Sequence, residues 1–292
     1  MDFLKDIEFT AEELGWIERM RSLLPACKRF YEWTRYPNAP VRSSALSGDR
    51  HDLIEPDVEA QYSLSIAAEH LLHGFETILH GEQISPTVHL TVGRTALLSA
   101  ANAYWLLEPT QRIIRQERLI ALKTQEIYEQ KAAMRDFPED LNSTESLEAY
   151  RRLLADKEES LWTAAAELGV GKQRFNQTSV IKNVANSLYS NDENAKLLQA
   201  QLILAWRDSS AAAHGYYHFA LPRAYIQNSG VSQISLLSAR IDLDHGPLFV
   251  GALMVANAAV RLYQLRAGLK LEDFLGTTAS KPRAGCPASR RR

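Results

Sequence analysis

The stretch VHLTVGRTALLSAANAYWLL, residues 88–107, decides the fold class of this 292-residue chain. It is apolar enough to test as a membrane span, and residues 248–265 form a second such stretch. Each carries an arginine, Arg94 in the first and Arg261 in the second. An ionised arginine near the middle of a span costs roughly 2.5–3.5 kcal/mol even on a lenient insertion scale. We therefore expect both stretches to be buried helices of a large soluble bundle, with no membrane as a partner.

The segments around these two stretches are also helical in pattern. Thr10 followed by Glu13 matches a capping box, which predicts a helix over residues 10–24, and Pro25 is expected to end it or to start the next helix. Further helices are expected over residues 55–80, 111–134, 145–168, 179–190 and 193–213. Residues 222–238 are the one segment with weak strand alternation. The sequence therefore predicts an all-α fold, a multi-helix up-and-down bundle.

Composition divides the chain into three parts. Residues 1–50 are expected to form an N-terminal helical arm and a linker, because residues 36–50 contain Pro37, Pro40 and Gly48. Residues 51–275 carry the apolar periodicity of the bundle domain. Residues 276–292 are rich in Pro, Gly and Ser, lack that periodicity and end in three arginines. We expect this basic tail to be disordered.

The charge and the cysteines restrict the partners and the compartment. A formal net charge of −2 gives no global attraction to nucleic acid, so RNA binding would need a local cluster such as Arg112, Arg115 and Arg118. Cys27 and Cys286 lie far apart and in no redox or metal-ligand spacing. The N-terminus is acidic where a signal peptide would be basic. Together these features predict a reduced, cytoplasmic location.

A histidine cluster was considered as a metal site. His70, His73 and His80 project close together on a helical wheel, but the spacings that aim ligands at one ion do not occur. The opposite side of the same helix is apolar, which indicates an amphipathic helix with a solvated polar face. We expect no metal and no cofactor.

The segment WRDSSAAAHG, residues 206–215, is the one local pattern typical of chemistry rather than packing. Arg207 and His214 are seven positions apart, so on a helix they point the same way, because two turns take about 7.2 residues. Ser210 lies between them. The two α-carbons are about 10.5 Å apart along the axis. Both groups therefore reach one phosphate only if Arg207 extends over it or the helix ends early, which Gly215 favours. In the alternative, structural interpretation, His214 bonds to Ser210 and Arg207 pairs with an acid.

Arg94 is the second arginine of interest. Its face of the apolar helix also carries Leu98, Ala101 and Trp105, so we expect it to be at least partly buried. A buried guanidinium requires a carboxylate or a bound anion. The sequence offers two interpretations, an ion pair with an acid such as Glu69 or Glu108, or a place beside the Arg207 and His214 site.

Residues 206–215 and 94–107 resemble segments of the HEPN superfamily, helical-bundle proteins with an Arg, usually followed by a polar residue, and a His after a further four to six residues. Arg207, Asp208 and His214 fit at the long end of that spacing. The similarity covers roughly residues 60–265. Many members are metal-independent endoribonucleases, often toxins or defence effectors, that work as dimers with a composite site. Other members lack activity and serve as nucleotide-binding or interaction modules.

The resemblance implies specific roles for the site residues. Arg207 would hold the scissile phosphate and His214 would transfer protons, with Arg94, Asp208 and Ser210 as binding residues. The ribose 2′-hydroxyl would attack and leave a cyclic phosphate. Two functions follow as expectations. The first is a homodimeric endoribonuclease or defence effector acting on RNA. The second is a non-catalytic binding or interaction module in which Arg207 and His214 are structural or bind a small anion.

Overall fold

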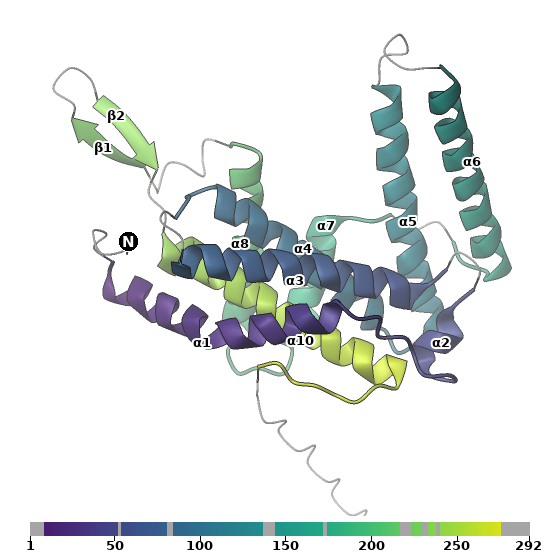
Figure 1. Cartoon of the computed structure of the whole chain (residues 1–292), viewed down its shortest axis with the longest axis horizontal. Helices are drawn as coiled ribbons and strands as arrows, with labels where there is room; N and C mark the ends of the chain where they lie inside the picture. The colour runs from purple at the N-terminus through teal and green to yellow at the C-terminus, as the bar shows by residue number, and fades with distance from the viewer. Residues whose placement is uncertain are drawn as a thin grey trace, which may run out of the picture.

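The computed structural model describes residues 9–51, 54–80, 84–136, 144–171, 174–216, 224–228, 233–237 and 240–275. Within these ranges the fold is all-α apart from one two-stranded hairpin (Figure 1). The elements are α1 Ala11–Thr34, α2 Ala45–Asp49, α3 Pro56–His80, α4 Val88–Leu107, α5 Arg112–Arg135, α6 Thr144–Glu167, α7 Gln177–Leu188, α8 Ala195–Ala213, β1 Ala224–Asn228, β2 Gln233–Leu237, η4 Ile241–His245 and α10 Gly246–Ala267. The predicted tail, residues 276–292, lies outside the described residues.

Helices α3, α4 and α10 form the centre of the molecule, as the apolar stretch at 88–107 predicts. Their close approach depends on two glycines. A Cβ added at Gly74 in α3 would lie 2.0 Å from the ring of Phe249, and one at Gly93 in α4 would lie 2.7 Å from Leu248. Both distances are far below van der Waals contact. The glycines therefore let α10 pack closely against both α3 and α4, although each weakens its own helix by about 1 kcal/mol relative to alanine.

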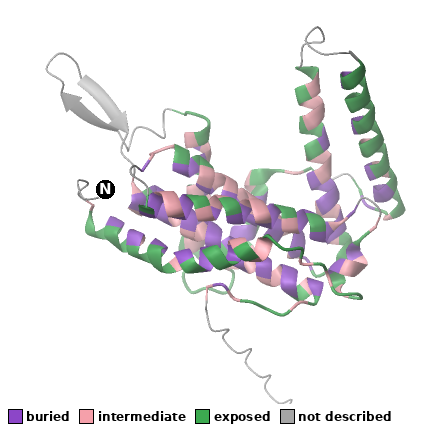
Figure 2. Ribbon diagram, in the orientation of Figure 1, coloured by how far each residue is buried: buried purple, intermediate pink, exposed green. Residues whose placement is uncertain are grey.

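Helix α10 continues from the π-helical turn η4, and Ile241–Ala267 is long and apolar enough to cross a membrane by length and composition. Buried residues make up 61% of its most apolar window. Burial of this kind is what the helix at the centre of a bundle requires. Figure 2 shows buried residues along α10.

The predicted N-terminal arm, α1, lies along α3 and adds Met20, Cys27 and Phe30 to the shared core. The capping box is confirmed, because Thr10 accepts from the Glu13 amide and Glu13 accepts from the Thr10 amide. The expected end of this helix at Pro25 is wrong, since α1 runs through to Thr34. Pro25 lies on the exposed side of the helix, while the following residues bury apolar side chains. That burial offsets the backbone hydrogen bond that proline removes.

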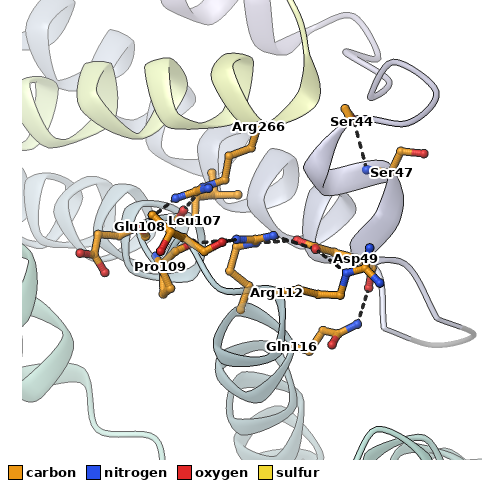
Figure 3. Close-up of polar contacts among 11 residues, drawn as sticks. Ser44, Ser47, Asp49, Leu107, Glu108, Pro109, Arg112, Gln116 and Arg266 are labelled. Atoms are coloured by element: carbon orange, nitrogen blue, oxygen red, sulfur yellow. Dashed lines mark hydrogen bonds and ion pairs between the residues drawn. The ribbon is translucent and has the colours of Figure 1, made fainter.

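Within residues 36–50, which were expected to be a linker or loop, α2 forms a short helix that is fixed by charge. Its Asp49 is fully buried and accepts two hydrogen bonds from Arg115 of α5, at 2.5 and 2.7 Å (Figure 3). Arg115 also donates to the carbonyl oxygens of Pro109 and Thr110, at 2.7 and 2.8 Å. Gln116 donates to the backbone of Asp49 at 2.8 Å. The segment before α3 is thereby attached to the base of α5.

This network overturns the interpretation of Arg112, Arg115 and Arg118 as a free basic face. Arg115 is only 2% exposed, and Arg112 lies 3.5 Å from the same Asp49 carboxylate. Arg118 pairs with Glu108 at 3.2 Å and packs over the Trp105 ring. The three arginines therefore form contacts within the protein, with Asp49 and Glu108.

The hairpin confirms the expected strand segment within residues 222–238. Strand β1 pairs with β2 in antiparallel register, with Tyr225 opposite Leu236 and Gln227 opposite Ile234. Figure 1 shows the hairpin projecting at one end of the molecule. At the other end, α5 and α6 project together as a helical arm.

Candidate functional site

Helix α8 carries the segment 206–215 and ends inside it. Gly215 adopts φ of 66°, the left-handed conformation that favours glycine. Its amide donates to the carbonyl of Ala212 at 3.2 Å, and the amide of Tyr216 donates to Ala211 at 3.0 Å. These two bonds form a Schellman cap. The early helix end that Gly215 favours is therefore present, and His214 occupies the C-cap position.

Arg207 and His214 are both exposed to solvent. Among the described residues, no hydrogen bond or ion pair joins either side chain to the protein. The His214 ring lies beside Tyr216, with ring centroids 5.6 Å apart. The structural interpretation, with His214 bonded to Ser210 and Arg207 paired to an acid, is not found in the described part of the chain. Both groups are accessible, as a shared site requires.

Arg94 reaches the same face from α4. Its Nε donates to Ser210 Oγ at 2.9 Å, and its guanidinium lies over the Trp206 ring at 4.6 Å from the centroid. No carboxylate of a described residue lies within 4.0 Å of it. The predicted acid partner is wrong, because Glu108 pairs instead with Arg118. Arg94 contacts α8 at Ser210, which lies between Arg207 and His214 in the sequence, and the other interpretation, a place beside the Arg207 and His214 site, stays a prediction.

A half-buried guanidinium without a carboxylate is an unusual arrangement. Burial lowers the pKa of Arg94 below its ordinary value, and the side chain still keeps its charge at neutral pH. A neutral hydroxyl and an aromatic face offset only part of the cost of removing that charge from water. A bound anion would supply the missing partner.

The site residues share one side of α8. Trp206, Ser210 and His214 follow one another at intervals of four residues, and Arg207 lies about 20° from His214 around the helix axis. Trp206 is buried and was not singled out from the sequence. Its spacing of four residues before Ser210 is the signal that identifies it as part of this face.

Asp208 is not brought into the group. It follows Arg207 by one position and precedes Ser210 by two, so it points about 160° away from Ser210 around the axis. Ser209 is buried and donates to the carbonyl of Ala205 at 2.7 Å, which is a bond within its own helix. The candidate site therefore consists of Arg94, Trp206, Arg207, Ser210 and His214.

Comparison with models of protein families, with curated proteins and with solved structures gives no match for this chain. The resemblance to the HEPN superfamily stays a prediction. Among the residues that the structure describes, no group of three or more His, Cys, Asp or Glu side chains is placed to hold a metal ion. The chemistry of the site is thus that of two arginines, a serine and a histidine.

Proposed function

We propose that this protein is an endoribonuclease of the HEPN type, in which Arg94 and Arg207 bind a phosphate of RNA and His214 transfers protons. The observation that carries the proposal is the half-buried Arg94 of α4, which Ser210 and Trp206 hold without a carboxylate on the side of α8 that also carries the exposed His214. Arginine suits bidentate phosphate contacts, and histidine titrates near neutrality. These groups perform the reaction without a metal ion.

The reaction has one bond formed and one broken. His214 accepts the proton of a ribose 2′-hydroxyl, and the oxygen attacks the adjacent phosphorus. The bond from phosphorus to the 5′-oxygen breaks, and a protonated His214 donates its proton to that oxygen. The products are a 2′,3′-cyclic phosphate and a 5′-hydroxyl. In our proposal a second copy of the chain contributes its own Arg207 and His214 to a composite site in a cytoplasmic homodimer.

The test is cleavage of a labelled RNA in the presence of EDTA. We expect wild type to cleave it and His214→Ala to lower the rate by about 10²- to 10⁴-fold, the usual contribution of a general acid or base. His80→Ala is the matched control, because His80 is an exposed histidine at the end of α3. RNA left intact by wild type from pH 6 to 8, where a known ribonuclease cleaves it, would contradict the proposal.

A second candidate function is a non-catalytic module that binds a small anion. It is favoured by the environment of His214, whose ring lies against Tyr216 with no second proton-transfer group bonded to it among the described residues. Thermal shift with pyrophosphate or a nucleoside monophosphate separates the two functions. In a binding module, Arg94→Gln loses the shift, Arg94→Lys retains part of it and His214→Ala keeps it.

A further inference from the structure

The arm formed by α5 and α6 carries a basic groove of its own. Helix α6 buries Leu147, Leu154 and Leu161, which are seven residues apart, and α5 buries Ile127 on its side. A seven-residue repeat is the pattern of helices that pack as a coiled coil. Because so few positions turn inward, most of α6 remains exposed (Figure 2). The outer surface of the arm is therefore available for a partner.

A groove of about 440 Å³ lies on the arm between the two helices. Met134 and Leu154 give it an apolar floor, and Tyr128 lies at its side with 58% of its surface exposed. Its charged lining residues, among those that the structure describes, are Lys131, Arg135 and Arg151, with no acid. The groove combines positive charge with an exposed aromatic ring.

The charge of the groove is local. Lys131 pairs with Glu158 across the arm, whereas the exposed Arg135 forms no ion pair with any described residue. Arg115 and Arg118 at the base of α5 are engaged by Asp49 and Glu108. Arg135, at the outer end of α5, is thus a groove cation that is available to a partner.

We propose that this groove binds single-stranded nucleic acid. Its cations lie where a phosphate backbone would run, and the Tyr128 ring offers a face on which a base stacks. Cationic grooves with aromatic platforms bind single strands in this way and tolerate different sequences. An acidic peptide would use the same cations, but it would leave the exposed aromatic ring without a stacking partner. The site goes beyond the proposed function, since it lies on the arm and its binding requires no cleavage.

The test is fluorescence anisotropy of a labelled single-stranded RNA, measured on full-length His214→Ala protein so that cleavage does not interfere. We expect the logarithm of the affinity to fall linearly with the logarithm of salt, with a slope of about −0.7 for each phosphate contact that a groove cation such as Arg135 makes. Tyr128→Ala should weaken binding about tenfold or more. Arg135→Glu should weaken binding and make the slope less steep.

Two matched controls lie on the same arm. Arg152→Glu changes the charge by the same amount beside Arg151, but Arg152 lies outside the groove and bonds to the Glu148 backbone. Tyr150→Ala removes an exposed phenol that lies near Gln130 and not in the groove. Both should bind as the parent does, and circular dichroism confirms that each variant is folded.

Three outcomes would overturn the proposal. One is no binding at low salt, and another is an equal loss in Arg135→Glu and Arg152→Glu. The third is tighter binding of a polyglutamate peptide than of the RNA. Because anisotropy needs no catalysis, a protein that cleaves no RNA can still pass this test, and one that cleaves RNA can still fail it.

Discussion

At the scale of single residues, His89 in α4 has hydrogen-bond partners at both ring nitrogens. The Ser85 amide donates to Nδ1 at 3.0 Å, and Nε2 lies 3.1 Å from Thr77 Oγ1. The Thr77 hydroxyl donates in turn to the His73 carbonyl at 2.8 Å. Nδ1 also lies 3.2 Å from the Ser85 carbonyl oxygen. Burial, followed by the charges of His245 and His73, lowers the pKa of His89 below its ordinary value of 6.5.

This lowered pKa predicts a loss of stability in acid. The unfolded chain binds a proton at His89 more readily than the folded protein does. The contribution of His89 to the free energy of unfolding is therefore fully present above about pH 6.5 and is lost as the pH falls towards the folded pKa. We expect the Tm to decrease as the pH is lowered from 7 to 5. Thermal unfolding monitored by circular dichroism measures this change.

The variant His89→Gln should make this decrease smaller, because glutamine does not titrate. His80→Gln, at an exposed position, should follow the wild-type profile. An unchanged pH profile in His89→Gln would assign the acid sensitivity to other groups.

At the scale of an element, the C-terminus of α8 depends on one backbone conformation. Gly215 has a φ of 66°, and a Cβ added there would have no atom within 4 Å. The effect of Gly215→Ala is thus a backbone effect without a steric clash. We expect the free energy of unfolding to decrease by about 1–2 kcal/mol, the cost of a left-handed conformation for an L-residue, measured by urea denaturation.

Gly171→Ala is the matched control for this prediction. A Cβ at Gly171 also meets nothing within 4 Å, and Gly171 does not have a positive φ. Its replacement should be neutral or slightly stabilising, because alanine restricts the unfolded chain. If both variants lost the same stability, the cap would not depend on the conformation of Gly215.

At the scale of the whole molecule, the buried pair of Asp49 and Arg115 joins the N-terminal segment to the base of the arm. Both side chains are at most 2% exposed. Removing one partner of a buried pair leaves an uncompensated charge, which costs about 3–5 kcal/mol. We expect Arg115→Met to lower the free energy of unfolding by an amount in this range, measured with urea.

The double variant Arg115→Met with Asp49→Leu should recover part of that loss, because neither charge then remains. Arg112→Ala is the control on the same carboxylate, since Arg112 is 61% exposed and lies 3.5 Å from Asp49. Its loss should be below about 1 kcal/mol, as for other exposed ion pairs. A similar loss in Arg112→Ala and Arg115→Met would mean that burial does not set the strength of this pair.

Local sequence patterns determined the helices other than α2 and the second half of α1. They also determined the capping box at Thr10, the segment that holds the two strands and the end of α8 at Gly215. Each of these features depends on residues within a few turns of one another, so periodicity and capping chemistry suffice to predict it. The same patterns placed Arg207, Ser210 and His214 on one side of a helix.

Tertiary packing decided what these elements do together. Ser210 receives a hydrogen bond from Arg94, 116 residues away in sequence, because α4 packs on α8. The Arg115 side chain is buried because it hydrogen-bonds to the buried Asp49. Helix α1 continues through Pro25 because the turns that follow the proline are buried in the core. Contacts between residues far apart in the sequence depend on which helix faces pack together. The helical periodicity of a sequence identifies the buried face of each helix, but it does not identify the helix that packs against that face.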